Sequence, residues 1–151
     1  MSHTAEIIAV GTELLLGNIV NTNARDISQA LSAVGVNVFW HTVVGDNPQR
    51  LKEALDVARR RAAIIITKGR LGPTYDDLTK QTICEAFGKP LVLHQDILDD
   101  LKVFFEKNVH MKMPSNNLQQ AELPEGCTVT GLEVDVYESP AELCLLGHSS
   151  A

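Results

Sequence analysis

The chain has 151 residues, and 13 lysines and arginines against 19 aspartates and glutamates give it a formal net charge of −6 at pH 7. An acidic average argues against a nucleic-acid binder, because such proteins use a basic face to displace counterions from phosphates. With 44% hydrophobic and 21% charged residues, the composition is that of a globular protein and excludes disorder of the whole chain. A chain of this length builds one substantial core, so a single domain is expected.

The start of the sequence has no basic segment followed by a long apolar stretch, so no secretory signal is predicted. The apolar runs are far shorter than the roughly 20 residues that a membrane helix requires. Cys84, Cys127 and Cys144 form no C-x-x-C pair, which fits neither a disulfide framework nor a zinc site. We therefore expect a cytoplasmic protein whose cysteines are small apolar fillers.

Three apolar segments have the composition of strands. Residues 6–10 and 62–66 are short runs without polar alternation, and both lead toward glycines. Such runs are typical of strands that are covered on both faces, as in a parallel sheet flanked by helices. Residues 36–44 are rich in β-branched and aromatic side chains and end before Gly45, which predicts a third strand.

Helical spacing of apolar residues separates these strands and follows the last of them. Three helices are predicted, over about residues 24–34, 48–62 and 78–87. Asp46, Asn47 and Pro48 are a helix start, and Gly35 and Gly88 are stop signals. Residues 59–61, all arginine, are expected to form a solvated helix end. The alternating order predicts an α/β fold, a three-layer sandwich with a mainly parallel sheet.

The pattern weakens toward the end of the chain. An apolar piece, a helix, the start of a short helix and a turn are predicted at residues 91–93, 96–107, 113–116 and 123–126. Residues 134–137 alternate as one strand would. The rest of residues 130–151 shows no clear element, so this tail is expected to be disordered or loosely docked.

Candidate binding residues stand where the predicted strands end, at residues 11–13, 45–48 and 67–77. In a parallel sheet, ligands collect at the carboxyl ends of the strands. The third segment places glycines, a hydroxyl residue and the pair Asp76 and Asp77 directly before a helix. Its amides suit a phosphate, and its carboxylates suit a divalent metal. The alternative is that the glycines make turns and that Asp76 or Asp77 only caps the helix.

Three long motifs carry a family resemblance: VGTELLLGNIVNTN at residues 10–23, TVVGDN at 42–47 and LGPTYDDLTK at 71–80. In these motifs, and again in residues 113–117 and 120–126, the chain resembles the N-terminal domain of the competence/damage-inducible protein CinA. That domain is similar to the molybdopterin-binding MoaB/MogA/gephyrin superfamily, whose members are oligomeric three-layer α/β proteins. The resemblance implies a domain at residues 1–129, followed by a divergent tail at residues 130–151.

The resemblance also implies a small-molecule site for a nucleotide or a pterin, with metal-dependent hydrolysis of an ADP-ribose-type pyrophosphate. By motif, Asp46 and Asp77 are the expected catalytic residues, and Asp46, Asp76 and Asp77 are the expected ligands of Mg²⁺, Co²⁺ or Mn²⁺. The expected phosphate- and nucleotide-binding residues are Gly11, Thr12, Glu13, Gly69, Arg70, Gly72 and Thr74. The implied assembly is a homo-oligomer, a dimer or a trimer, without nucleic-acid or membrane partners.

The sequence departs from the family pattern at two places. Arg70 stands where related chains carry a glycine of the phosphate loop, which predicts strain or a blocked ligand and hence impaired hydrolysis. The alternative is that Lys68 and Arg70 add cationic contacts to a phosphate. Residues 130–151 lack the segment that closes the site in related domains.

The nicotinamide-mononucleotide deamidase domain of full CinA proteins is also not recognisable in the sequence, so no deamidase activity is expected. Two alternatives to an enzyme follow from these departures. One is a non-catalytic module that binds a nucleotide or molybdopterin, and the other is a truncated oligomerising remnant.

Overall fold

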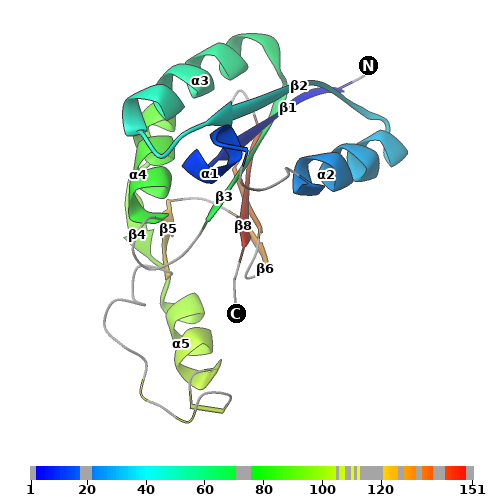
Figure 1. Ribbon diagram of the computed structural model, residues 1–151. Coiled ribbons are helices and arrows are strands. Elements are labelled where there is room, and N and C mark those ends of the chain that lie inside the picture. Colours follow the sequence, from blue (N-terminus) through cyan, green and yellow to red (C-terminus); the bar gives the residue numbers. More distant parts are fainter. Residues whose placement is uncertain are drawn as a thin grey trace.

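The computed structural model describes residues 3–17, 22–70, 76–104, 106–107, 110, 112, 121–125, 128–131, 134–137 and 142–148. The helices are α1 (Thr12–Leu15), α2 (Thr22–Ala33), α3 (Pro48–Arg61), α4 (Asp76–Phe87) and α5 (Gln95–Phe104). The strands are β1 (His3–Val10), β2 (Val36–Val44), β3 (Ile64–Arg70), β4 (Leu91–Leu93), β5 (Glu122–Pro124), β6 (Thr128–Gly131), β7 (Val134–Tyr137) and β8 (Glu142–His148). Figure 1 shows the sheet and its helices, with α5 extending away from them.

Six strands form one sheet in the order β2-β1-β3-β8-β7-β6. The pairs β1–β2, β1–β3 and β3–β8 are parallel, whereas β7 and β6 add two antiparallel pairings. From β1 the chain moves outward to β2 and then crosses back to β3 on the other side of β1. Sheets of this class bind ligands at such a reversal, which here lies at the carboxyl ends of β1 and β3. The predicted α/β fold with a mainly parallel sheet is confirmed.

Local sequence signals set the ends of the main helices. The Asn47 side chain accepts a hydrogen bond from the Arg50 backbone N–H at 3.0 Å, and Pro48 occupies the first turn of α3. Gly35 and Gly88 follow α2 and α4 with φ angles of 83° and 66°. These left-handed angles strain a residue that has a Cβ, so the glycines end both helices as predicted.

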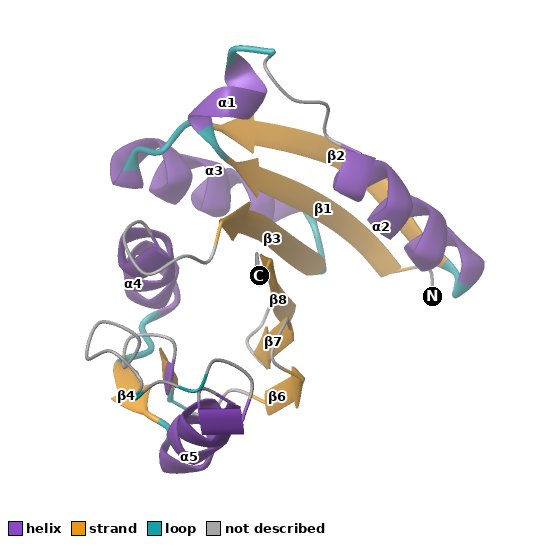
Figure 2. Ribbon diagram, turned by 60° about the horizontal axis from the view of Figure 1, so that its bottom comes forward, coloured by secondary structure: helices purple, strands orange, loops and turns teal. Residues whose placement is uncertain are grey.

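Alternation along β1 divides the core into two clusters, one on each face of the sheet. Ile8 and Val10 belong to the cluster that α3 and α4 cover, while Ile7 belongs to the cluster that α2 covers. Figure 2 shows α3 on one side of the parallel strands and α2 on the other. Leu51 and Leu55 of α3 are almost completely buried, and each contributes about 1.5–3 kcal/mol of burial free energy. No described helix has the length and apolar character needed to cross a bilayer.

A β-bulge in β2 places an aromatic ring beside a buried carboxylate. Ala5 pairs with Val38, but the next residue, Glu6, pairs with Trp40, so Phe39 is the extra residue. One extra residue reverses the alternation, and Val38 therefore packs on the α2 face while Trp40 shares a face with Glu6.

The Glu6 side chain is buried and forms an ion pair with Arg61 at the end of α3. Arg61 donates from Nε to Oε2 at 2.9 Å and from Nη2 to Oε1 at 2.8 Å, and Thr42 donates its hydroxyl to Oε1 at 2.6 Å. The Arg61 guanidinium also lies 4.6 Å from the centre of the Trp40 ring. The arginines of this helix end keep exposed surface, as predicted, but the sequence analysis missed the inward ion pair of Arg61.

The hydrogen bonds decide the protonation state of Glu6. Burial raises the pKa of this carboxyl, but the hydrogen bonds from Arg61 and Thr42 and the positive charge of Arg61 outweigh burial. The net pKa lies below the ordinary value of 4.5. Glu6 is therefore a carboxylate throughout the neutral range and joins β1, β2 and α3.

The small lobe consists of β4, β5 and α5 and lies apart from the main sheet (Figure 1). β4 and β5 pair antiparallel, and α5 covers them with the cluster Ile97, Leu98, Leu101, Ala121 and Leu123. The predicted turn at residues 123–126 is wrong for Leu123 and Pro124, which end β5. A proline is tolerated there because a two-stranded sheet has only edge strands. The short helix predicted at residues 113–116 lies outside the described residues.

The C-terminal strands extend the main sheet. β7 coincides with the strand predicted at residues 134–137, but β8 corrects the expectation of no further regular element. β8 pairs in parallel with β3 from Ile64 opposite Glu142 to Arg70 opposite His148. The run at residues 142–148 is too short and too weakly patterned to identify a strand, and its pairing with β3 supplies the missing information. The division of the chain at residue 130 stays a prediction.

Removal of the Glu6 charge is expected to destabilise the fold. Glu6→Gln keeps the side-chain size but leaves Arg61 without its bidentate partner, so the free energy of unfolding should fall by about 1–3 kcal/mol. Urea denaturation at pH 7 measures the change. Glu53→Gln, on the exposed side of α3, is the control and should change stability by less than about 0.5 kcal/mol. An unchanged urea midpoint for Glu6→Gln would contradict the role of the pair.

The same pair predicts a pH dependence of stability. Because the folded-state pKa of Glu6 is lowered, its contribution is complete above the unfolded-state pKa near 4.5 and is lost as the pH falls through the folded value. Urea midpoints measured from pH 7 down to pH 3 should therefore decrease more steeply for the wild-type chain than for Glu6→Gln below about pH 4.5. Parallel curves for the two proteins would rule out a lowered pKa of Glu6.

Candidate functional site

The carboxyl ends of β1 and β2 carry two of the three predicted loops, and the structure brings these loops together. The Gly11 backbone N–H donates to the Val44 carbonyl at 2.8 Å, which continues the pairing of β1 and β2 past the end of β1. Thr12 then begins α1, and Asp46 lies two residues after Val44. This contact fixes the two loops side by side at the rim of the sheet.

Thr12 and Asp46 bind each other reciprocally. The Thr12 hydroxyl donates to Oδ2 of Asp46 at 3.2 Å and accepts a hydrogen bond from the Asp46 backbone N–H at 3.2 Å. The Thr12 backbone N–H also points to Oδ2, at 3.4 Å. All these described contacts use Oδ2 or the backbone of Asp46, and Asp46 is exposed. The arrangement orients one acidic side chain without burying it.

Close approach of side chains explains the glycines in these loops. A Cβ at position 11 would lie 3.2 Å from the Glu13 carboxylate, and a Cβ at position 45 would lie 3.2 Å from the Leu15 side chain. Both distances are tighter than ordinary van der Waals contact. Gly11 has an extended backbone with φ of 165°, and the atoms closest to a Cβ there belong to the flexible Glu13 carboxylate. The Glu13 carboxylate thus folds back toward the Gly11 backbone.

The third predicted loop is described only at its two ends. Gly69 and Arg70 are the last residues of β3, opposite Gly147 and His148 of β8, and Asp76 and Asp77 are the first residues of α4. Their side chains, together with all of Gly72 and Thr74, lie outside the described part of the structure. An extended strand tolerates any residue type, so the backbone strain expected at Arg70 does not arise. Obstruction of a ligand by this side chain stays a prediction.

Two polar residues lie just before this loop, Thr67 and Lys68. The Thr67 hydroxyl is buried, its residue being 2% exposed, and has no hydrogen-bond partner. Lys68 is half-buried, and burial lowers the pKa of its ammonium group below the ordinary value. Lys68 was predicted from the sequence as a possible cationic contact, whereas Thr67 was not predicted. Thr67 could have been identified from the sequence, because it is the polar residue that directly follows the apolar run at residues 64–66.

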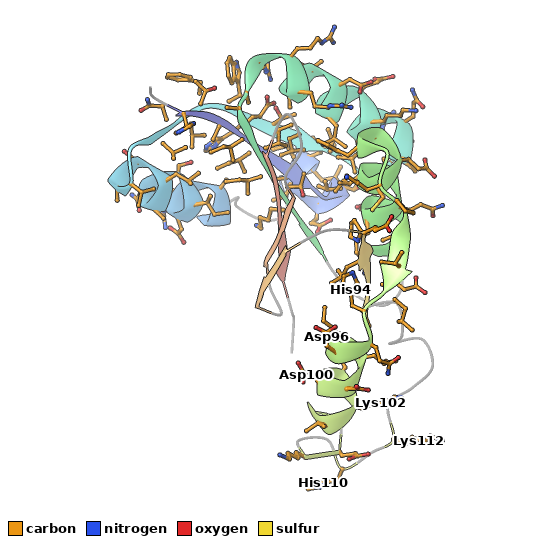
Figure 3. The ribbon with its side chains drawn as sticks, turned by 180° about the vertical axis from the view of Figure 1, so that it is seen from behind. His94, Asp96, Asp100, Lys102, His110 and Lys112 are labelled. Carbon is orange, nitrogen blue, oxygen red and sulfur yellow. The ribbon has the colours of Figure 1, made fainter. Side chains whose placement is uncertain are left out.

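The described residues contain no cluster of three or more histidine, cysteine, aspartate or glutamate side chains that could hold a metal. Of the three metal ligands predicted from the sequence, Asp46, Asp76 and Asp77, only Asp46 has a described side chain. In the small lobe, the charged residues labelled in Figure 3 are spread along and beyond α5 instead of converging on one point: His94, Asp96, Asp100, Lys102, His110 and Lys112.

Comparison with known families identifies the class of this domain. Residues 6–134 match the family model described as a probable molybdopterin-binding domain. The chain belongs to this family of molybdopterin-binding domains. Within it, the sequence is 57% identical over 125 residues to a protein of Acetivibrio thermocellus that bears the name competence-damage inducible protein. It is 50% identical over 124 residues to a CinA-like protein of Dictyoglomus thermophilum. The predicted resemblance to CinA is confirmed.

The matched region makes up 83% of this chain but only 30% of the Acetivibrio protein, so the chain corresponds to less than a third of that relative. Among solved structures, CinA from Thermoplasma acidophilum superposes with a TM-score of 0.78 at 26% identity, covering 97% of this chain and 88% of that chain. MoaB from Thermus thermophilus superposes with a TM-score of 0.60 at 16% identity, covering 97% of this chain and 82% of that chain. The second likeness shows a shared fold.

Proposed function

We propose that this domain binds a nucleotide and hydrolyses a pyrophosphate of the ADP-ribose type with the help of a divalent metal ion. The observation that carries the proposal is the oriented, exposed carboxylate of Asp46 at the carboxyl edge of the sheet. The site lies at the point where the strand order reverses, and sheets of this class bind ligands there. Membership in a molybdopterin-binding family supports a phosphorylated small molecule as the ligand.

Asp46 has the properties of a metal ligand. Thr12 fixes its orientation through Oδ2, as outer-shell hydrogen bonds do for metal-binding carboxylates, and leaves the second oxygen available. Asp76 and Asp77 start α4, which follows β3 from the same edge, and we assign both to the metal by their place in the chain. Carboxylate oxygens suit Mg²⁺ or Mn²⁺, and Co²⁺ also accepts them. Such an ion would neutralise phosphoryl charge and activate a water molecule.

Gly11 and Thr12 contribute by positioning Asp46. The Gly11 N–H already donates to Val44, and the Thr12 N–H already points to Asp46. Neither amide is therefore available to a phosphate without breaking a contact that holds the rim together. In this proposal the phosphates bind the segment from Gly69 to Thr74, and residues 11 and 12 keep the acidic group in place.

A non-catalytic module that binds a nucleotide or molybdopterin is the second candidate. It is favoured by the pairing of β3 with β8, which continues through Gly69 and Arg70. Backbone groups that belong to a strand ladder are less free to form a phosphate cradle than those of an open glycine loop. Both candidates share the ligand class and differ in turnover. The homo-oligomer, a dimer or a trimer, stays part of the proposal and can be measured by light scattering.

Removal of the Asp46 charge should abolish turnover without unfolding the domain. With ADP-ribose and Mn²⁺, Asp46→Asn should reduce the rate of AMP release by about 10²-fold or more, because the metal loses an anionic ligand. Its free energy of unfolding should change by less than about 1 kcal/mol, since Thr12 and Asp46 are exposed. Asp56→Asn, on the exposed side of α3, is the matched control. ADP-ribose binding without AMP release by the wild-type chain would favour the module.

Arg70→Gly tests whether the arginine limits the reaction. If its side chain occupies the space of the ligand, the glycine variant should release AMP at least about tenfold faster, a gain of about 1.4 kcal/mol in transition-state binding. The comparison uses the same ADP-ribose and Mn²⁺ assay, with Arg50→Gly near the start of α3 as a control for loss of an exposed arginine. A slower rate in Arg70→Gly would instead indicate that Arg70 contacts the phosphates.

A further inference from the structure

Lys68 lies near the carboxyl end of β3, on the face of the sheet that α2 covers. Ile64 and Ile66 belong to the cluster under α2, and Lys68 follows them in the alternation of the strand. Its backbone pairs with Ala9, which precedes Gly11 by two residues. The Lys68 side chain therefore leaves β3 on this face one residue before Gly69, beside the end of β1 that leads into Gly11.

The Lys68 ammonium has no anionic partner among the described residues. Burial is the cause of its lowered pKa, and no neighbouring carboxylate offsets it. Of the acidic side chains described at this edge, Asp46 binds Thr12, and the Glu13 carboxylate folds back toward the Gly11 backbone. A half-buried cation without a counter-charge lowers the free energy of unfolding, and a bound anion would raise it again.

The overall charge makes this local cation important for an anionic ligand. With a formal net charge of −6, the chain repels phosphates at long range, so a positive group at the binding point offsets this repulsion. Lys68 is the cation whose side chain is described at the β1–β3 crevice, the place where ligands bind in sheets of this order.

We infer that Lys68 binds an anionic group of the ligand, a phosphate or diphosphate, on the α2 side of the crevice between β1 and β3. Lys68 acts as a binding residue, because its ammonium group gives a phosphorylated ligand a higher affinity than a neutral one. The inference deepens the proposed function and rests on it for the location of the site. It does not require metal or turnover, because the attraction is between the ammonium and the anion alone.

The test is calorimetric titration of the full chain with inorganic pyrophosphate in the presence of EDTA, which excludes the metal. Lys68→Met should weaken pyrophosphate binding about tenfold or more, whereas Lys68→Arg should stay within about threefold of the wild type. Lys52→Met changes the net charge equally on the exposed side of α3, and its affinity should stay within about twofold. Equal affinity of Lys68→Met and the wild type, or no pyrophosphate binding by the wild type, would overturn the inference.

The stability of the ligand-free chain is an independent readout. Lys68→Met removes an unpaired, half-buried charge, so its melting temperature should rise by about 2–4 °C without ligand, and pyrophosphate should no longer raise it. A lower melting temperature would mean that Lys68 supports the fold, and this too would overturn the inference.

Pyrophosphate binding by Lys68→Met and ADP-ribose hydrolysis by the wild type and Asp46→Asn together distinguish a failure of this inference from a failure of the proposed function. Pyrophosphate binding that depends on Lys68, together with no ADP-ribose hydrolysis by the wild type, would overturn the proposed enzyme and leave the inference standing. Hydrolysis that depends on Asp46, together with unchanged pyrophosphate binding by Lys68→Met, would do the reverse.

Discussion

The parallel pairing of β1 with β2 on one side and β3 on the other is the constraint on which the rest of the molecule depends. It brings the ends of three strands to one edge, and it places the reversal of strand order at β1. The buried Glu6 carboxylate reinforces this arrangement, because its partners Thr42 and Arg61 come from β2 and from the end of α3. A single polar cluster thus joins β1 to β2 and to the end of α3.

The rim of the sheet combines rigid and unsatisfied groups. Gly11, Thr12 and Asp46 hold one another through backbone and side-chain hydrogen bonds, so Asp46 needs little reorganisation to bind a cation. On β3, by contrast, the Thr67 hydroxyl and the Lys68 ammonium have no described partner. Such uncompensated groups are costly to keep in a fold, and proteins retain them where a ligand supplies the missing interaction.

The pairing of β3 with β8 affects both candidate functions. It covers the edge of β3 and thereby completes the sheet, but it also extends regular strand structure into Gly69 and Arg70. In the proposed function, the first two residues of the phosphate-binding segment therefore belong to the sheet. Binding and turnover place different demands on that loop, because a ligand needs space and charge, whereas hydrolysis also needs exact positioning of a water molecule.

The sequence by itself determined the central strands, the helix ends and the family. Unbroken apolar runs, Asn47 with Pro48, and the glycines at 35 and 88 act through local geometry, which neighbouring residues specify. Asp46 and Thr12 were predicted from motifs, and the parallel sheet explains why they meet. Only the tertiary structure revealed the Glu6–Arg61 pair, the bulge at Phe39, the buried Thr67 hydroxyl without a described partner and the half-burial of Lys68. It also decided the strand β8, because a short run becomes a strand through a partner that is distant in sequence and close in space.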